Sequence, residues 1–366
     1  MKIKRKLLPD KYLLILYIAL LIAGLVAIYG AQTVHEPNTK YFSNHLNLLL
    51  LMFGFSIIML LVPDFFDIID NNIPIILFST IILLGYVLIF GITVAGSFAK
   101  RWIYIPPGFT IQPSELAKIT ISIYMASVLA KKGEKLTNIK KGLVPPLIIL
   151  IIVSVLIAIE PDLGTALLFA MVCFSMFLYG GIPLRSLIIS WIFLLLVSVV
   201  FVFNVPYMKS RVDVYLDPEK QSEEDTYQMK RATLAFNYGG LTGIPDENIR
   251  DVSTHLPAAI TDFIFASIAQ RYGLIGNLII LILFVAFTAR GLIVSYRIKE
   301  NIFLKNLSFG LTMFISIQAF LNMMVATLII PTTGLPLPFI SYGRNALVIN
   351  MIMYTILLKI TQRREL

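Results

Sequence analysis

The sequence predicts an all-α polytopic membrane protein in which ten transmembrane helices form a single domain over residues 1–366. Apolar residues make up 58% of the chain and charged residues only 14%, whereas an average soluble domain is about half apolar and a quarter charged. The apolar residues are gathered in runs of the length that a bilayer-crossing helix needs, about 20 residues. The chain also lacks the glycine-rich phosphate-binding motifs of soluble nucleotide enzymes. A soluble enzyme domain with a membrane tail is therefore excluded.

Breaks between the apolar runs separate the predicted spans. These spans cover residues 12–31, 45–63, 73–95, 114–130, 143–160, 163–180, 186–204, 262–287, 306–330 and 341–360. The first run follows the basic segment KIKRK, but it is about 20 residues long and lacks an A-x-A site, which favours an uncleaved span over a signal peptide. Acidic residues separate the second and third runs, a proline opens the fourth, and Pro161 separates the fifth from the sixth. A proline-rich and glycine-rich segment separates the last two.

The distribution of basic residues predicts how these spans are oriented. Most of the 30 lysine and arginine residues fall in segments on the same side as the N-terminus, and cytoplasmic segments are enriched in such residues. Ten spans then place both termini in the cytoplasm and put the long polar loop 205–259, between the seventh and eighth spans, outside. The same distribution accounts for the net charge of +9, so the basic excess does not indicate nucleic-acid binding.

Charged side chains at membrane depth need a partner or a function, because each costs about 2.5–3.5 kcal/mol on insertion scales. In the fourth span, Glu115 and Lys118 are three residues apart and share one helical face. They either form a local ion pair at the helix end or both face a polar groove. Just before this span, Lys100 and Arg101 precede Trp102 at the outer interface, where paired cations suit an anionic lipid headgroup.

Two aspartates stand before apolar runs on the outer side. Asp162 follows a proline and is expected to cap the sixth span. Asp262 either caps the eighth span or lies at the outer boundary with hydrocarbon on one side, which would raise its pKa toward that of a general base. Arg271, nine residues further on, needs a counter-charge, for which Glu115 and Glu160 are the candidates.

Two outer stretches have unusual backbone requirements. Segment 331–338 holds three prolines and a glycine, so it cannot form a regular helix, and non-helical backbone at membrane depth needs protein or water around it. Within 205–259, a short amphipathic helix would present Lys230 and Arg231 and end at the glycines of 239–243.

The outer face thus combines cations, one boundary carboxylate and irregular loops. The cations are Arg101, Lys230, Arg231 and Arg344. This set suits an amphiphilic substrate whose negatively charged head lies at the leaflet while its tail stays in lipid. The cations would hold a pyrophosphate through charge-assisted hydrogen bonds, and Asp262 would deprotonate an attacking sugar hydroxyl.

Motifs between about residue 100 and residue 345 resemble those of the SEDS family, the shape, elongation, division and sporulation proteins of bacterial wall synthesis. In chain order they are RWI at 101–103, QPSELAK at 112–118, PDLGTALL at 161–168, YQ at 227–228, GGL at 239–241, TDFIFA at 261–266, GLIG at 273–276 and PTTGLPLPFISYG at 331–343. The resemblance implies ten transmembrane helices and a peptidoglycan glycosyltransferase that polymerises lipid II into a nascent glycan strand.

The resemblance also implies roles for residues and a partner. Asp262 would activate the acceptor hydroxyl, and Arg101, Glu115 and Lys118 would line or support the substrate groove. The reaction would take place at the outer face of the bacterial cytoplasmic (inner) membrane, among membrane lipids. The implied partner is a class B penicillin-binding protein, a transpeptidase that crosslinks the strands.

The chain departs from the family pattern beside the proposed base. Ala258-Ala259-Ile260 stand where family members commonly carry Glu-x-His, Gln270-Arg271 replace two acidic residues, and Arg344-Asn345 replace Gly-Ser. Each change removes negative charge or adds positive charge, so support for a metal is reduced. No cofactor is assigned from the sequence, and a divalent cation is left open.

Two questions remain open at this level. The segments IYMASVLAKK and YGGIP resemble the division branch of the family, whereas GLPLPFISYG is common in the elongation branch; we favour division. The alternative function is a flippase or transporter of the lipid-linked precursor, in which Glu115, Lys118 and Arg271 would line a path, and a scaffolding role is the third. A flippase needs access from both leaflets, and the clustering of unusual loops outside disfavours it.

Overall fold

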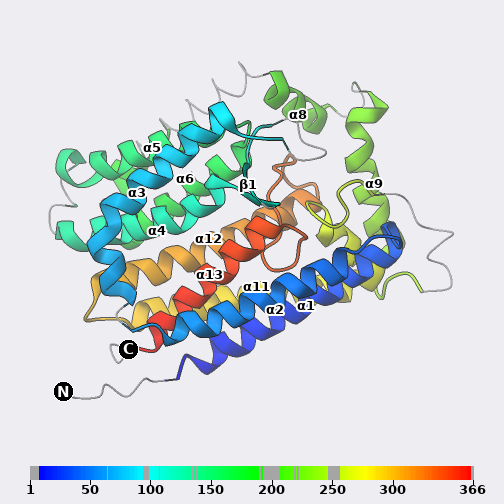
Figure 1. Ribbon diagram of the computed structural model, residues 1–366. Coiled ribbons are helices and arrows are strands. Elements are labelled where there is room, and N and C mark those ends of the chain that lie inside the picture. The colour runs from blue at the N-terminus through cyan, green and yellow to red at the C-terminus, as the bar shows by residue number, and fades with distance from the viewer. Residues whose placement is uncertain are drawn as a thin grey trace.

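The computed structural model describes residues 8–63, 65–93, 99–106, 108–133, 136, 139–188, 191–192, 206–217, 220, 222–245 and 256–363. In this part of the chain, helices form a bundle that carries one β-hairpin at its side (Figure 1). The helices are α1 (Lys11–His35), α2 (Tyr41–Leu61), α3 (Phe65–Phe90), α4 (Pro113–Lys132), α5 (Val144–Ile159), α6 (Leu163–Tyr179), α8 (Pro206–Leu216), α9 (Glu223–Gly239), α11 (Ile264–Arg297), α12 (Ile302–Ala326) and α13 (Arg344–Thr361). The antiparallel strands are β1 (Ile103–Ile105) and β2 (Phe109–Ile111).

Six helices are long and apolar enough to cross a membrane. They are α1, α2, α3, α11, α12 and the helix Lys141–Ile159, which contains α5. The chain is therefore a multi-pass membrane protein, as the composition predicts. Helices α4, α6 and α13 match three further predicted spans. Most of the seventh predicted span, 186–204, lies outside the described residues, so the count of ten stays a prediction.

The first and last described helices meet at one end of the bundle. The backbone N–H of Asp10 donates to Oγ1 of Thr361, with 2.9 Å between N and O. Asp10 also caps α1 and forms an ion pair with Arg290 of α11. Helices α8 and α9 lie at the opposite end, as does the hairpin (Figure 1). The start of α1 and the end of α13 therefore lie at the same end of the bundle, and their side of the membrane stays a prediction.

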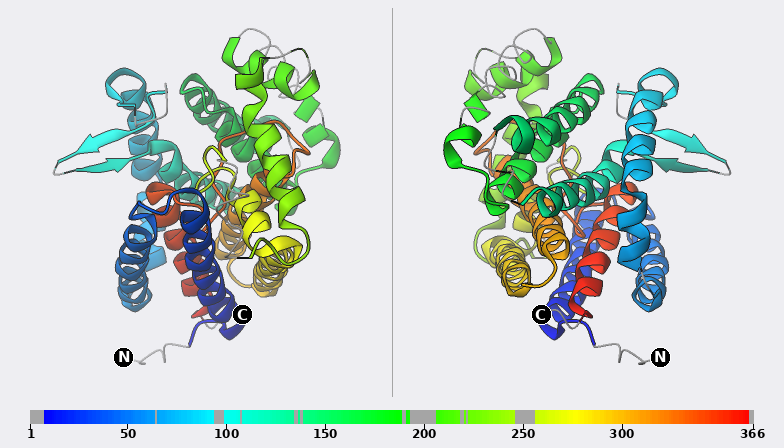
Figure 2. Two further views of the ribbon diagram at one scale, coloured as in Figure 1. Left: turned by 90° about the vertical axis from the view of Figure 1, so that its right-hand side faces the viewer. Right: turned by 90° about the vertical axis from the view of Figure 1, so that its left-hand side faces the viewer.

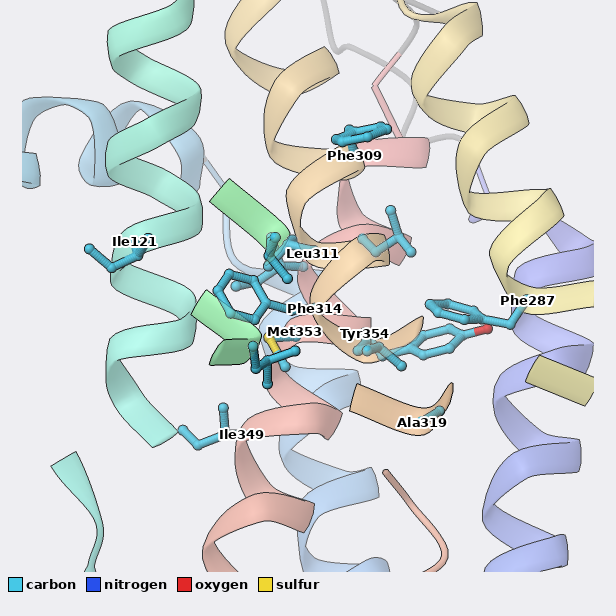
Figure 3. Packing of buried hydrophobic residues seen from close by; sticks show 14 of the residues in the cluster. Ile121, Phe287, Phe309, Leu311, Phe314, Ala319, Ile349, Met353 and Tyr354 are labelled. Carbon is cyan, nitrogen blue, oxygen red and sulfur yellow. The ribbon is translucent and has the colours of Figure 1, made fainter. Parts of the chain in front are cut away.

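Helix α12 forms the centre of the bundle and packs against α4, α6, α11 and α13. Figure 3 shows Leu311 and Phe314 of α12 between Ile121 of α4 and the ring pair Phe287–Tyr354. All five side chains are fully buried. The peripheral helices instead leave apolar residues uncovered, as a lipid-facing surface does; on α3, for example, 65% of Ile75 and 68% of Ile89 are exposed.

Helix α11 is broken at Gly273, whose φ of 67° lies in the left-handed region. The turn that follows α9 supplies hydrogen-bond acceptors for the backbone N–H groups after the break. The N–H of Leu274 donates to the carbonyl of Gly240 at 2.9 Å, and that of Ile275 donates to the carbonyl of Leu241 at 3.2 Å. Non-helical backbone in a membrane protein is stable only where other groups satisfy it. The prediction that α9 ends at these glycines is confirmed.

Candidate active site

Asp262 lies in the turn 257–263 that leads into α11. The helix begins at Ile264, two residues later than the predicted span, and its N-cap is Phe263. The interpretation of Asp262 as a helix cap is therefore wrong, and its half-buried carboxylate is left for another role. Asn322 of α12 fixes the turn, since its Nδ2 donates to the carbonyl oxygen of Asp262 at 2.9 Å.

A cavity of about 170 Å³, which we call the arginine cavity, comes close to Asp262, which is not itself a lining residue. Its lining residues are Arg101, Trp102, Gln112, Glu115, Asp162, Thr165, Gly334, Pro336, Gly343, Arg344, Asn345 and Ala346. Gly334 lines the cavity and also lies close to the carboxylate of Asp262. A Cβ built on Gly334 would lie 4.0 Å from Oδ2 of Asp262. The φ of Gly334 is 74°, a backbone conformation that glycine adopts without steric cost.

Arg101 joins the start of the hairpin to the turn between α5 and α6. Its Nε donates to the carbonyl of Glu160 at 2.9 Å, and its guanidinium also bonds to the carbonyl of Pro161. The Nη1 atom lies 3.6 Å from Oδ2 of Asp162. Asp162 in turn caps α6 by accepting from the N–H of Thr165 at 3.2 Å, which confirms the predicted cap. Arg101 thus holds this turn at the cavity wall.

Glu115 and Lys118 form the ion pair that their spacing allows. The Nζ atom of Lys118 lies 2.6 Å from Oε1 of Glu115, and it also donates to Oε1 of Gln318 at 2.8 Å. Gln318 links this ion pair to the loop after α12, since its Nε2 donates to the carbonyl of Pro336 at 2.8 Å. Glu115 lines the arginine cavity, whereas Lys118 is completely buried beneath it. Lys118 therefore supports the irregular loop from inside.

A second cavity, of about 260 Å³, lies between α8, α9 and the segment after α12. Its lining residues are Ser210, Arg211, Val214, Tyr215, Gln228, Met229, Leu328, Ile330, Pro331 and Thr332. Arg211 donates to the carbonyl of Thr332 at 2.8 Å and acts electrostatically on Asp262. Arg211 could not be singled out from the sequence, because its charge in a long polar loop was the only available signal.

Burial and neighbouring charges set the proton affinity of Asp262. Burial raises the pKa of this carboxyl above its usual range and is the largest influence. Arg211 lowers the pKa, Asp162 raises it, and Arg101 lowers it, but burial prevails. The Glu160 carboxyl, in the turn between α5 and α6, has its pKa raised to about 8, mainly by burial and further by Asp162. Asp262 is consequently a stronger base than an exposed aspartate.

Three predicted cations lie away from the arginine cavity. Lys230 is exposed on α9, and Arg231 packs over the ring of Tyr227 with 4.8 Å from its Cζ to the ring centroid. Neither lines the arginine cavity or the second cavity, so their role in substrate binding stays a prediction. An ion pair between Arg271 and Glu115 was one expectation, and it is wrong, because Glu115 is paired with Lys118. Arg271 instead donates to the carbonyl of Ile244 at 3.2 Å.

Among the described residues, no three acidic, histidine or cysteine side chains are grouped closely enough to hold a metal ion. Asp162 forms an ion pair with Arg101, and Arg211 exerts the largest electrostatic influence on Asp262. The donor set around the cavity therefore does not fit a divalent cation.

The fold and the site define a class of protein, a multi-pass membrane protein with a carboxylate beside an arginine-lined cavity at the end opposite the start of α1. Over residues 11–366 the chain matches the family model FTSW/RODA/SPOVE, described as cell cycle protein. The chain belongs to this family, and the resemblance seen in the sequence is confirmed.

Named relatives and solved structures cover nearly the whole chain. A probable peptidoglycan glycosyltransferase FtsW of Geobacter sulfurreducens is 34% identical over 361 residues, covering 97% of this chain and 95% of the relative. The protein of the same name from Legionella pneumophila is 31% identical, covering 96% and 90%. A chain of a solved peptidoglycan synthase complex superposes with a TM-score of 0.79 at 23% identity, covering 96% and 97%. The rod shape determining protein RodA of Thermus thermophilus gives a TM-score of 0.69 at 22% identity, covering 96% of each chain.

Proposed function

We propose that this chain is a peptidoglycan glycosyltransferase that polymerises lipid II into glycan strands at the outer face of the cytoplasmic membrane. The observation that carries the proposal is the position of the Asp262 carboxylate, which lies next to Gly334 at the wall of the arginine cavity. The relatives named peptidoglycan glycosyltransferase support the same activity.

The arginine cavity has the chemistry to hold the diphosphate of a lipid-linked sugar. Arg101 and the exposed Arg344 both line the cavity, and both supply charged donors. Residues 343–346, the cap and first turn of α13, also line the cavity. The unpaired N–H groups of a helix N-terminus favour an anion in the same place. The prenyl tail would remain in the lipid beside the bundle.

Asp262 would supply the base for glycosyl transfer. The hydroxyl oxygen of the acceptor sugar attacks the anomeric carbon of the donor sugar and forms the new glycosidic bond. The bond between that carbon and the diphosphate oxygen breaks, and the prenyl diphosphate leaves with the bonding electrons. The hydroxyl proton passes to the carboxylate of Asp262. Arg101 and Arg344 would stabilise the charge on the leaving diphosphate.

A flippase is the alternative function, but the contacts of Lys118 and Arg271 do not support it. Lys118 is bonded to Glu115 and Gln318 inside the bundle, and Arg271 is bonded to the outer loop at Ile244. These contacts serve packing and support the loop, whereas a flippase needs charges along a path between the leaflets.

The two functions are separated by one experiment on the purified full chain in liposomes. Fluorescent lipid II is supplied on both leaflets, and products are analysed on gels while a leaflet-specific quencher follows transport. We expect glycan chains to form while lipid II in the leaflet that the quencher cannot reach stays protected from it. Rapid transport with no glycan product would instead support the flippase.

We further propose that the chain works in division with a class B penicillin-binding transpeptidase. The named relatives are FtsW proteins, which supports the division branch. The solved relative comes from a complex described as coordinating polymerization and crosslinking, which supports a crosslinking partner. Co-purification with candidate transpeptidases from the same cell tests this pairing.

A further inference from the structure

The hairpin formed by β1 and β2 has one apolar face and one more polar face. In its register, Ile103 pairs with Ile111 and Ile105 pairs with Phe109. Side chains alternate between the two faces of a strand, and paired residues share a face. The remaining pair, Tyr104 with Thr110, therefore occupies the opposite face. The apolar face consists of Ile103, Ile105, Phe109 and Ile111.

Within the described residues, this apolar face lacks a core to pack against near its tip. Phe109 is 68% exposed and Ile105 is 40% exposed. Figure 2 shows the hairpin projecting sideways from the bundle, away from α8 and α9. An isolated two-stranded hairpin is marginally stable at best in water. Its apolar face therefore needs an apolar medium.

The position of the hairpin indicates that this medium is lipid. Its base is tied to the end of α3 by two hydrogen bonds between Ile92 and Trp102, with N–O distances of 2.8 and 3.4 Å. The last turn of α3 presents Ile89 and Phe90, which are 68% and 62% exposed, so the hairpin continues an apolar surface that faces lipid. Segment 99–112 contains no acidic residue, and Lys100 in it is exposed. Aromatic residues and nearby cations suit the headgroup region of a bilayer.

We propose that the apolar face of the β1–β2 hairpin is embedded in the membrane leaflet at the α8–α9 end, with Lys100 at the lipid phosphates. The two ends of the hairpin, Arg101 and Gln112, line the arginine cavity. Anchoring the hairpin in the leaflet holds the mouth of this cavity at the depth of lipid headgroups. The proposal rests on membrane insertion of the chain and is independent of the reaction proposed above.

Site-directed spin labelling of the full chain in liposomes tests this placement. Cys173 is the only cysteine, so a Cys173→Ala background allows single labels. Labels are introduced by Phe109→Cys on the apolar face and by Tyr104→Cys on the opposite face. Ile82→Cys marks a lipid-facing site on α3 that is 52% exposed. Lys220→Cys marks an aqueous site, where the native side chain is 77% exposed.

The measured quantity is the ratio of collisions with oxygen, which concentrates in lipid, to collisions with a water-soluble nickel chelate. We expect the ratio at position 109 to approach that at position 82 and to exceed the ratios at positions 104 and 220. A ratio at 109 equal to that at 220 overturns the proposal. Shielding of position 109 from both reagents that disappears on dilution of the protein in lipid also overturns it, because a second copy would then cover the face.

A second variant tests the placement without a spin label, which could itself disrupt the hairpin. Phe109→Trp keeps an aromatic side chain, and its added fluorescence over wild type is measured in liposomes that contain brominated lipids. We expect brominated lipid to quench this added signal and aqueous iodide to leave it largely unchanged. The reverse pattern contradicts a lipid-embedded hairpin.

Discussion

Asn322 of α12 binds the backbone carbonyl of Asp262, with 2.9 Å between Nδ2 and O. The same Nδ2 atom also donates to the carbonyl of Leu335, at 2.8 Å. One buried amide on the central helix therefore holds the turn that carries the proposed base together with the irregular loop beside it. The geometry of the site depends on α12 as well as on the turn and the loop that it holds.

Loss of this amide is expected to weaken both stability and catalysis. Asn322→Leu leaves two carbonyls without their donor, at a cost of about 1–3 kcal/mol for each buried unsatisfied group. Because Asn322 positions Asp262 without touching substrate, kcat should fall while KM changes little. Asn350→Leu is the matched control, since the buried amide of Asn350 has no hydrogen-bond partner among the described residues. Equal losses in the two variants would contradict the positioning role.

The pH dependence of the reaction is expected to respond to Arg211. Arg211 lowers the pKa of Asp262, so Arg211→Met should raise that pKa further. The base acts only when ionised, and the acidic limb of kcat/KM should therefore move to higher pH. Lys209→Met removes an exposed cation from the same helix and serves as the control. An unmoved limb in Arg211→Met would argue against Asp262 as the titrating base.

Glu160 is expected to make the protein less stable as pH rises. Its folded pKa is about 8 against an ordinary value of 4.5, so the unfolded chain ionises first. The contribution of Glu160 to the free energy of unfolding is fully present below about pH 4.5 and is lost progressively up to about pH 8. Glu160→Gln stays neutral and should exceed wild type at pH 8 by at most about 5 kcal/mol, with little difference near pH 4.5.

Thermal unfolding in detergent between pH 4.5 and 8 measures this effect. Glu300→Gln, at an exposed position, provides the control. A wild-type protein whose stability does not change across this window would show that Glu160 stays ionised in the fold.

The buried ion pair is expected to behave as a unit. Lys118→Met leaves the Glu115 carboxylate buried without its partner and should destabilise by about 3–5 kcal/mol. The double variant Glu115→Gln with Lys118→Met should recover much of this loss, because no buried charge remains. Lys131→Met breaks the exposed pair with Asp70 and should cost no more than about 1 kcal/mol. Chemical or thermal unfolding of these three variants and of the single variant Glu115→Gln measures the coupling, and additive losses would contradict it.

Local sequence patterns predicted the features that depend on local spacing. The apolar runs located nine helices of the described bundle, the proline before Asp162 predicted its cap, and the three-residue spacing predicted the pairing of Glu115 with Lys118. The glycines at 239–243 correctly marked the end of α9. Each of these depends on residues that are close to one another in the sequence.

The parts that were missed depend on contacts between distant segments. Arg211 reaches the loop after α12 across 121 residues, and Asn322 reaches Asp262 across 60. Periodicity carries no information about which helix ends meet, so neither contact could be predicted. The hairpin did have a local signal, since IYI and FTI alternate on either side of a Pro-Pro-Gly turn. The two strands have only three residues each, so this signal was not separated from the longer apolar runs.

Polymerisation of lipid II by Asp262→Asn tests the role of the proposed base most directly. The substitution keeps the shape of the side chain and removes its basicity, and Asp217→Asn, at an exposed site near α8, is the control. Both are compared with wild type in liposomes by gel analysis of glycan products. We expect Asp262→Asn to lose about 10²–10⁴-fold in rate, the contribution of a general base, while Asp217→Asn remains active. Glycan formation by Asp262→Asn at the wild-type rate would contradict the account.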